Sequence, residues 1–151
     1  MSNPPQPFFP LEPGYLVGVE PLDRQHQEMV NLLNELHGSV LNKTGGNRPL
    51  DLLNQLLKLA KTHFTTEEQV LRVHSYPGYL RHKAAHEGLA SNLAEYREQI
   101  VARKRDVSLE YVELIKLWLL DHFAEFDRDY AKFLVGQNQA NEEESHDGRD
   151  I

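Results

Sequence analysis

Seven side chains that can bind a metal recur at helical spacing along this chain of 151 residues. They lie in four separate stretches, and each stretch carries apolar residues at intervals of three and four. The seven are His26, His63, Glu67, His82, His86, His122 and Asp127. Residues four apart lie on one face of a helix, as His63 and Glu67 would. The pattern therefore predicts helices that bring these side chains to one buried two-metal centre.

The apolar periodicity predicts four helices with short connections, and no stretch has the alternation expected of a strand. We expect the helices at roughly residues 21–41, 49–73, 79–103 and 108–135. Helices in this order favour an all-α fold, an antiparallel up-down-up-down four-helix bundle. A chain of this length suits one domain with one core.

Two segments should lie outside this bundle of residues 21–135. Residues 1–20 are rich in proline, which interrupts both helices and sheets, so we expect an extended N-terminal arm that packs on the bundle. The arm's candidate packing residues are Phe8, Phe9, Tyr15 and Val17. Residues 136–151 have an excess of acid and one apolar residue, which favours a disordered acidic tail.

Composition narrows the class of partner and of metal site. The formal net charge of -7 argues against nucleic acid as a partner. The absence of cysteine excludes a thiolate site, leaves nitrogen and oxygen ligands, and suits a reducing compartment. No window approaches the roughly 18 apolar residues of a membrane-spanning helix. We therefore expect a cytoplasmic protein that is not an integral membrane protein.

A polar core of hydrogen-bonded histidines is the alternative to a metal site, because a lone histidine in an apolar stripe is more often of that kind. Five imidazoles and two carboxylates without partners would cost several kcal/mol per group, which a metal would offset. This ligand number exceeds the needs of one zinc ion and suits two iron ions. The zinc-site motif HExxH is absent, because His86 and Glu87 are not followed by a histidine at the required position. The ExxH motif of ferritin-like di-iron sites occurs once, ending at His146 in the tail.

Coordination numbers then suggest a function. Two octahedral ions offer about twelve positions. Five histidines, two bridging carboxylates and one bridging oxo or hydroxo group would fill all but one of them. If the carboxylates do bridge, one vacant position in an apolar pocket suits a small diatomic ligand such as molecular oxygen.

The motifs around these residues resemble those of the hemerythrins, specifically the single-domain bacterial kind called bacteriohemerythrin. The resemblance covers about residues 15–135. It is carried by GVEPLDRQH ending at His26, HFTTEE beginning at His63, YPGYLRHKAAH ending at His86 and WLLDHFAEFD ending at Asp127.

The resemblance implies that His82, His86 and His122 hold one iron. It implies that His26 and His63 hold the other, and that the two irons are bridged by an oxo or hydroxo group and by two carboxylates. These bridging residues would be Glu67 and Asp127. The implied function is reversible oxygen binding, for transport, storage or delivery, without enzymatic activity. The resemblance also places Leu119 and Trp118 at the oxygen pocket, although both also suit an ordinary core.

Other functions stay open. One is a di-iron oxidase or peroxidase, which would need substrate access to the core. Another is a sensor of oxygen, nitric oxide or redox state, which would need a partner protein. Iron storage is less favoured because no cage-forming surface is evident. An oxygen carrier could itself serve an oxygen-consuming partner protein.

The chain also departs from the family pattern. The arm lacks the tryptophan common in the family, and Phe123 and Phe126 are bulkier than expected beside the last ligands. These differences bear on pocket size and ligand access. Two histidines lie outside the motifs: His37 is expected at the surface, and His74 is expected as a loop residue at a helix break, with a role near the site as the less favoured alternative.

The spacing of His122 and Asp127 is awkward for a regular helix. Five residues at 100° each leave the two side chains about 140° apart. Either the helix contains a π-bulge between them, or Asp127 approaches the metals from the flank. We favour the bulge, because π-bulges concentrate at functional sites.

Overall fold

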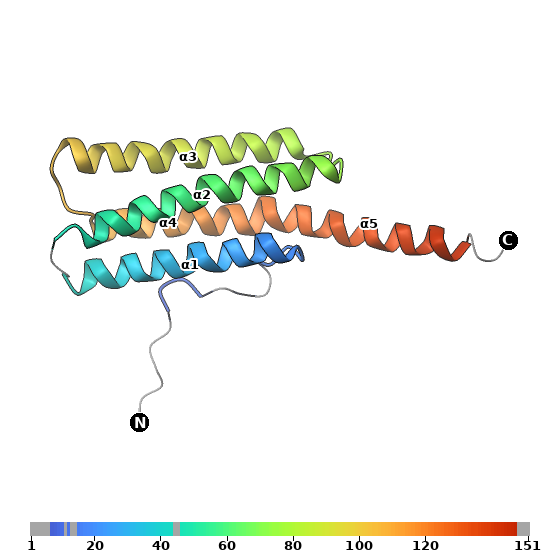
Figure 1. Cartoon of the computed structure of the whole chain (residues 1–151), viewed down its shortest axis with the longest axis horizontal. Coiled ribbons are helices and arrows are strands. Elements are labelled where there is room, and N and C mark those ends of the chain that lie inside the picture. The colour runs from blue at the N-terminus through green and yellow to red at the C-terminus, as the bar shows by residue number, and fades with distance from the viewer. Residues whose placement is uncertain (1–6, 11, 13–14, 44–45, 148–151) are drawn as a thin grey trace, which may run out of the picture.

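The protein folds into a four-helix bundle, seen here in a computed structural model that describes residues 7–10, 12, 15–43 and 46–147. Its elements are α1 (Glu20–Leu41), α2 (Arg48–Val73), α3 (Tyr79–Ala102), α4 (Leu109–His122), the π-helical turn η2 (Phe123–Asp127) and α5 (Arg128–Asp147). In Figure 1 the helices lie along the long axis of the molecule and successive helices run in opposite directions, with α4 and α5 forming one continuous rod. α1 and α3 each pack against both α2 and α4. The predicted all-α, antiparallel up-down-up-down bundle is confirmed, and the described residues contain no strand.

Local sequence explains where these helices begin and end. α1 and α2 each carry proline in the first turn, where its missing N–H is not needed. Ser108 caps α4, and its hydroxyl accepts a hydrogen bond from the Tyr111 N–H. After α2 the chain reverses through Ser75, whose φ of 52° is left-handed. No described helix is long and apolar enough to cross a membrane.

Two apolar clusters fill the bundle, and the polar ligand residues lie between them along the helices. The larger cluster includes Met29 of α1 and Phe64 of α2. The smaller cluster, here called the turn-end cluster, consists of buried Val17, Leu22, Leu71, Tyr130 and Leu134 with partly buried neighbours. Because His26 lies between Leu22 and Met29 in α1, it is flanked by apolar core on both sides along the helix.

The described part of the N-terminal arm packs against α1. Phe9 is fully buried, its N–H donates to Asn34 Oδ1 over 2.8 Å, and its carbonyl accepts from Asn34 Nδ2 over 3.0 Å. Phe8 stacks on His37 with ring centroids 3.9 Å apart, so His37 is covered rather than freely exposed. Residues 1–6, 11 and 13–14 of the arm lie outside the described residues.

The acidic C-terminal segment differs from the expected disordered tail. α5 continues to Asp147, and Figure 1 shows it projecting beyond the ends of the other helices. Charge density favoured disorder, but the segment contains three glutamates, two glutamines and one alanine, which are good helix formers. It also extends a helix that is already anchored, so it avoids the cost of nucleation. The expectation for residues 148–151 lies outside the described part of the chain.

Candidate metal centre

The fold brings all seven expected ligand residues together in the core, and none is more than 5% exposed. Their donor atoms form two groups, and within each group the atoms lie within 4.8 Å of one another. One group consists of Glu67, His82, His86, His122 and Asp127, and the other of His26, His63, Glu67 and Asp127. The two groups therefore share both carboxylates and differ in the number of histidines.

The histidines turn the same ring nitrogen toward the centre. Nε2 of His26 lies 2.9 Å from Nε2 of His63, and Nε2 of His86 lies 3.1 Å from Nε2 of His122. Nε2 of His82 faces both carboxylates. Nitrogen lone pairs gathered in this way can bind a cation that lies between them.

The opposite nitrogen of three histidines donates to a fixed acceptor. Nδ1 of His26 donates to the Tyr15 carbonyl over 3.2 Å, and Nδ1 of His63 donates to Gln25 Oε1 over 2.8 Å. Nδ1 of His86 donates to Glu68 Oε2 over 3.1 Å. A proton on Nδ1 leaves Nε2 unprotonated toward the centre, which is the usual arrangement of a metal-ligating histidine.

Sequence reasoning assigned no role to Gln25 and Glu68. Each is adjacent in sequence to a predicted ligand, but neighbours in a helix point in different directions. Gln25 reaches a histidine of α2, and Glu68 reaches one of α3. Only the packing of one helix against the next reveals these contacts. Adjacency to a ligand motif was the one available signal.

Each shared carboxylate directs one oxygen to each donor group. Glu67 Oε1 lies 3.2 Å from His86 Nε2, and Glu67 Oε2 lies 3.3 Å from His63 Nε2. Asp127 Oδ1 lies 3.1 Å from Nε2 of both His82 and His122, whereas Asp127 Oδ2 lies 3.2 Å from His26 Nε2. This is the orientation that a carboxylate needs to bridge two cations.

Several of these polar atoms have no hydrogen-bond partner among the described residues. They are both oxygens of Glu67, both oxygens of Asp127 and both ring nitrogens of His82. The oxygens lie close to ring nitrogens but not in hydrogen-bonding geometry. Such buried groups are costly when unsatisfied. Cations held between the nitrogens and oxygens would satisfy the carboxylates and His82 Nε2, so the residues present fit a metal centre.

The charges of the site are strongly coupled. Burial disfavours the charged form of Glu67, but His122, His63 and His82 beside it hold the pKa of this carboxyl well below its usual value. Burial likewise lowers the pKa of His122, but the carboxylates of Asp127 and Glu67 outweigh it and raise that pKa to about 10. The carboxylates are therefore anions that require positive charge beside them.

The turn η2 confirms the predicted π-bulge between His122 and Asp127. The wider turn brings Asp127 onto the side of His122, where its carboxylate contacts three histidines. The turn also places two aromatic rings on ligands. Phe123 lies 4.4 Å from the His26 ring, and Phe126 stacks on His122 at 5.5 Å, both measured between centroids.

The two residues expected at an oxygen pocket occupy different environments. Leu119 is 1% exposed and belongs to the larger apolar cluster. Trp118 is partly buried and stacks on Tyr96 with centroids 5.0 Å apart. Trp118 also lines a surface depression of about 220 Å³ that reaches His122 and Phe126. Their role at an oxygen pocket stays a prediction.

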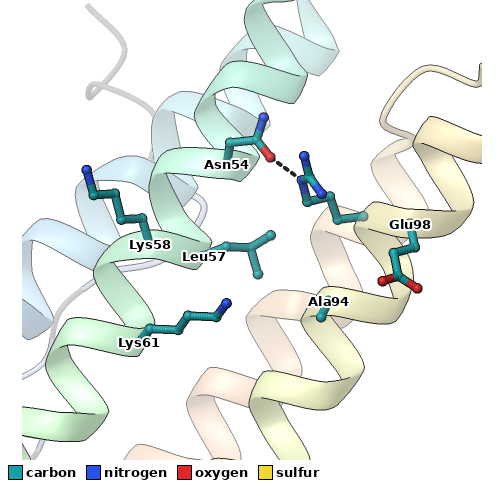
Figure 2. A pocket seen from close by; sticks show the side chains of 7 residues that line it. Asn54, Leu57, Lys58, Lys61, Ala94 and Glu98 are labelled. Atoms are coloured by element: carbon teal, nitrogen blue, oxygen red, sulfur yellow. Dashed lines mark hydrogen bonds between the residues drawn. The ribbon is translucent and has the colours of Figure 1, made fainter.

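A second groove lies away from the metal ligands, between α2 and α3, with a volume of about 480 Å³ (Figure 2). Figure 2 shows Leu57 pointing into it and the amine of Lys61 turned toward α3, whereas Lys58 points away. Arg97 is hydrogen-bonded to Asn54 across the groove. Of the basic side chains at this groove, Arg97 is therefore hydrogen-bonded and Lys58 points away from it.

Comparison with known proteins agrees with the geometry of the centre. Residues 17–134 match the family described as the hemerythrin HHE cation binding domain. The chain is 30% identical over 117 residues to a bacteriohemerythrin of Aquifex aeolicus, covering 75% of this chain and 87% of the relative. It is 29% identical over 117 residues to a bacteriohemerythrin of Stenotrophomonas maltophilia, covering 76% and 74%.

Solved structures agree at the level of the fold. A wild-type hemerythrin is 25% identical, with a TM-score of 0.69, over 76% of this chain and 87% of that chain. A point mutant of hemerythrin has a TM-score of 0.76 and 22% identity, over 84% of this chain and 97% of that chain. With a family match that covers residues 17–134, which include all seven candidate ligand residues, this chain belongs to the hemerythrin family.

Proposed function

We propose that this protein binds molecular oxygen reversibly at a non-haem di-iron centre, as a carrier, a store or a delivery protein. In this proposal His82, His86 and His122 hold one iron, and His26 and His63 hold the other. Glu67, Asp127 and an oxo or hydroxo group bridge the two ions. Leu119 and Trp118 would line the oxygen pocket, and an oxygen-consuming protein is the natural partner of a carrier.

The proposal rests chiefly on the unequal donor groups that share two carboxylates. If each donor group binds one ion and both carboxylates are shared, one ion would have three histidine ligands and the other would have two. The ion with two histidines has the free coordination position, which suits a small ligand such as oxygen. Phe123 and the larger apolar cluster lie beside His26, and an apolar surrounding excludes water from a bound ligand.

One set of measurements tests this function. The iron-loaded protein should contain two irons per chain and absorb in the near ultraviolet through an oxo-bridged centre. Exposure to oxygen and then to vacuum should change the spectrum of the reduced protein reversibly, with oxygen recovered unchanged. An enzyme would instead consume oxygen together with a reductant. One zinc per chain, or no metal after growth with ample iron, would rule the proposal out.

A further inference from the structure

A second group of polar and aromatic side chains lies in the turn-end cluster, beyond the proposed metal ligands. The hydroxyl of Tyr130, a fully buried residue, lies 3.1 Å from Nδ1 of His74. The Tyr130 ring is 5.3 Å from the ring of Tyr76, which is 6.5 Å from the ring of His82, each measured between centroids. A continuous aromatic path therefore links a metal ligand to a buried tyrosine.

Gly78 makes room for the middle member of this path. A Cβ at Gly78 would lie 2.8 Å from Cε2 and 2.9 Å from Cζ of Tyr76. The backbone φ of Gly78 is -86°, which any residue can adopt. The glycine therefore matters here because it has no side chain, which leaves room for the Tyr76 ring. The Tyr76 ring is thus held between the turn, His82 and Tyr130, while it remains only half-buried. A reductant in solution can approach it.

His74 can accept the proton of Tyr130. In the tautomer that carries its proton on Nε2, Nδ1 of His74 presents a lone pair, and the Tyr130 O–H donates to it over 3.1 Å. Burial, together with the negative charge of Glu67, raises the pKa of Tyr130, so its phenol stays protonated until it is oxidised.

We propose that Tyr130, His74 and Tyr76 form a relay that carries oxidising equivalents away from the metal centre after it reacts with hydrogen peroxide. Tyr76 connects His82 to Tyr130, and Tyr130 is the residue that holds the radical, because it alone has a proton acceptor in place. The inference rests on the proposed di-iron centre and adds a protective role to it. It also gives a function to His74, for which a loop position was favoured over a role near the site.

The chemistry balances when two tyrosines react. The O–O bond of peroxide breaks on uptake of two electrons and two protons, which yields two waters. If both irons are already ferric, these electrons come from the protein. Tyr130 gives one electron to the centre and its proton to His74, and Tyr76 gives the second electron and its proton to solvent. A one-electron reductant such as ascorbate then restores each phenol by supplying one electron and one proton.

Electron paramagnetic resonance of the oxidised, iron-loaded protein mixed with hydrogen peroxide tests the relay. We expect a tyrosyl signal that narrows when the tyrosine rings are deuterated. Tyr130→Phe should abolish the long-lived signal, because the Tyr76 radical lies within reach of solvent reductants and decays, while Tyr79→Phe, which alters another tyrosine packed against the same cluster, should leave it. His74→Phe should also remove the long-lived radical, because the oxidised phenol then has no proton acceptor.

A second variant tests the path without changing any redox-active group. Gly78→Ala should displace the Tyr76 ring and lower the radical yield at Tyr130, with iron content and near-ultraviolet spectrum unchanged. The relay is overturned if the protein with two irons gives no tyrosyl signal, or if the long-lived signal persists in Tyr130→Phe. A protein without iron would instead reject the di-iron function itself, so the iron count separates the two failures.

Discussion

In His26, His63 and His86 the two ring nitrogens have different tasks. Nε2 faces the site where a cation would bind, and the Nδ1 contact sets both the tautomer and the angle of the ring. For His63 that contact is the side chain of Gln25 on the neighbouring helix, which is neutral and only partly buried. Removing the contact should therefore weaken the site without removing any ligand.

We expect Gln25→Leu to lower iron affinity by about 10- to 100-fold, the usual effect of losing such an outer hydrogen bond. The loss should fall on the iron bound by His26 and His63. Iron retained per chain during titration with a chelator measures this effect. Gln27→Leu is the matched control, since Gln27 is exposed and bonds only to Asn31 on the same helix. Equal iron retention in both variants would contradict the assignment.

Within the four helices of the bundle, the turn η2 departs from regular α-helical geometry, and its departure is local. The turn accommodates a spacing of five residues from His122 to Asp127, where a regular helix would align residues only four apart. Ala124 and Glu125 of this turn are exposed, so the extra residue lies on the solvent side. The apolar faces of α4 and α5, on either side of this turn, therefore both lie toward the core.

Deletion of Ala124 should therefore convert η2 to regular α-helix without moving its neighbours. His122 and Asp127 would then be four apart and share one face. We expect a folded bundle that still binds two irons, with a melting temperature of the metal-free protein equal to or above that of the parent. Circular dichroism on heating and iron analysis measure these properties.

Deletion of Leu117 is the control, because this exposed residue lies in the regular part of α4. Its loss would rotate Val112 and Ile115 by about 100° relative to Leu119. Strong destabilisation is expected there. If both deletions destabilise the protein equally, the bulge is not the site of an extra residue.

The same element illustrates what sequence can predict. Apolar periodicity located both ends of the first three helices and the start of the fourth within a residue or two, and the spacing of His122 and Asp127 predicted the bulge. The seven candidate ligand residues could be proposed because each lies on the apolar face of its helix, and the fold brings them together. The contacts of Gln25 and Glu68 depend on how two helices pack, so no single-helix pattern encodes them. The helical tail was not predicted, because the excess of acidic residues favoured disorder although the segment contains good helix formers.

At the scale of the molecule, the centre joins the four helices of the bundle. α1, α2, α3 and the α4 to α5 rod each supply at least one buried ligand residue. These polar groups interrupt the apolar core between its two clusters. The bundle thus contains a central layer that is stable only if its charges and lone pairs are satisfied.

Removing iron should therefore lower the free energy of unfolding by several kcal/mol, since metal binding is coupled to folding. We expect the metal-free protein to remain helical but to melt at a lower temperature, with looser packing near the ligands. Denaturant titration of the metal-free and iron-loaded protein measures the difference. Equal stability of the two forms would show that the core needs no metal.

The pH dependence of stability should also differ between these two forms. Burial alone would lower the pKa of His122, but Asp127 and Glu67 raise it from 6.5 to about 10 in the protein without metal. The same carboxylates also raise the pKa of His26 and His82 against the effect of burial. A group whose pKa is raised by folding binds its proton more tightly in the folded state. The stability that such a group contributes is complete below its pKa in the unfolded state, and it is lost as the pH rises to its pKa in the folded state.

The metal-free protein should therefore lose a few kcal/mol of stability as the pH rises from 6.5 toward about 10. In the iron-loaded protein a cation replaces these protons, so the same pH range should leave its stability nearly unchanged. Urea unfolding at several pH values in this range measures both slopes. His122→Gln should make the slope of the metal-free protein shallower, because one of the three histidines with a raised pKa is gone. A steep slope in the iron-loaded protein would mean that protons, and not a cation, compensate Glu67 and Asp127.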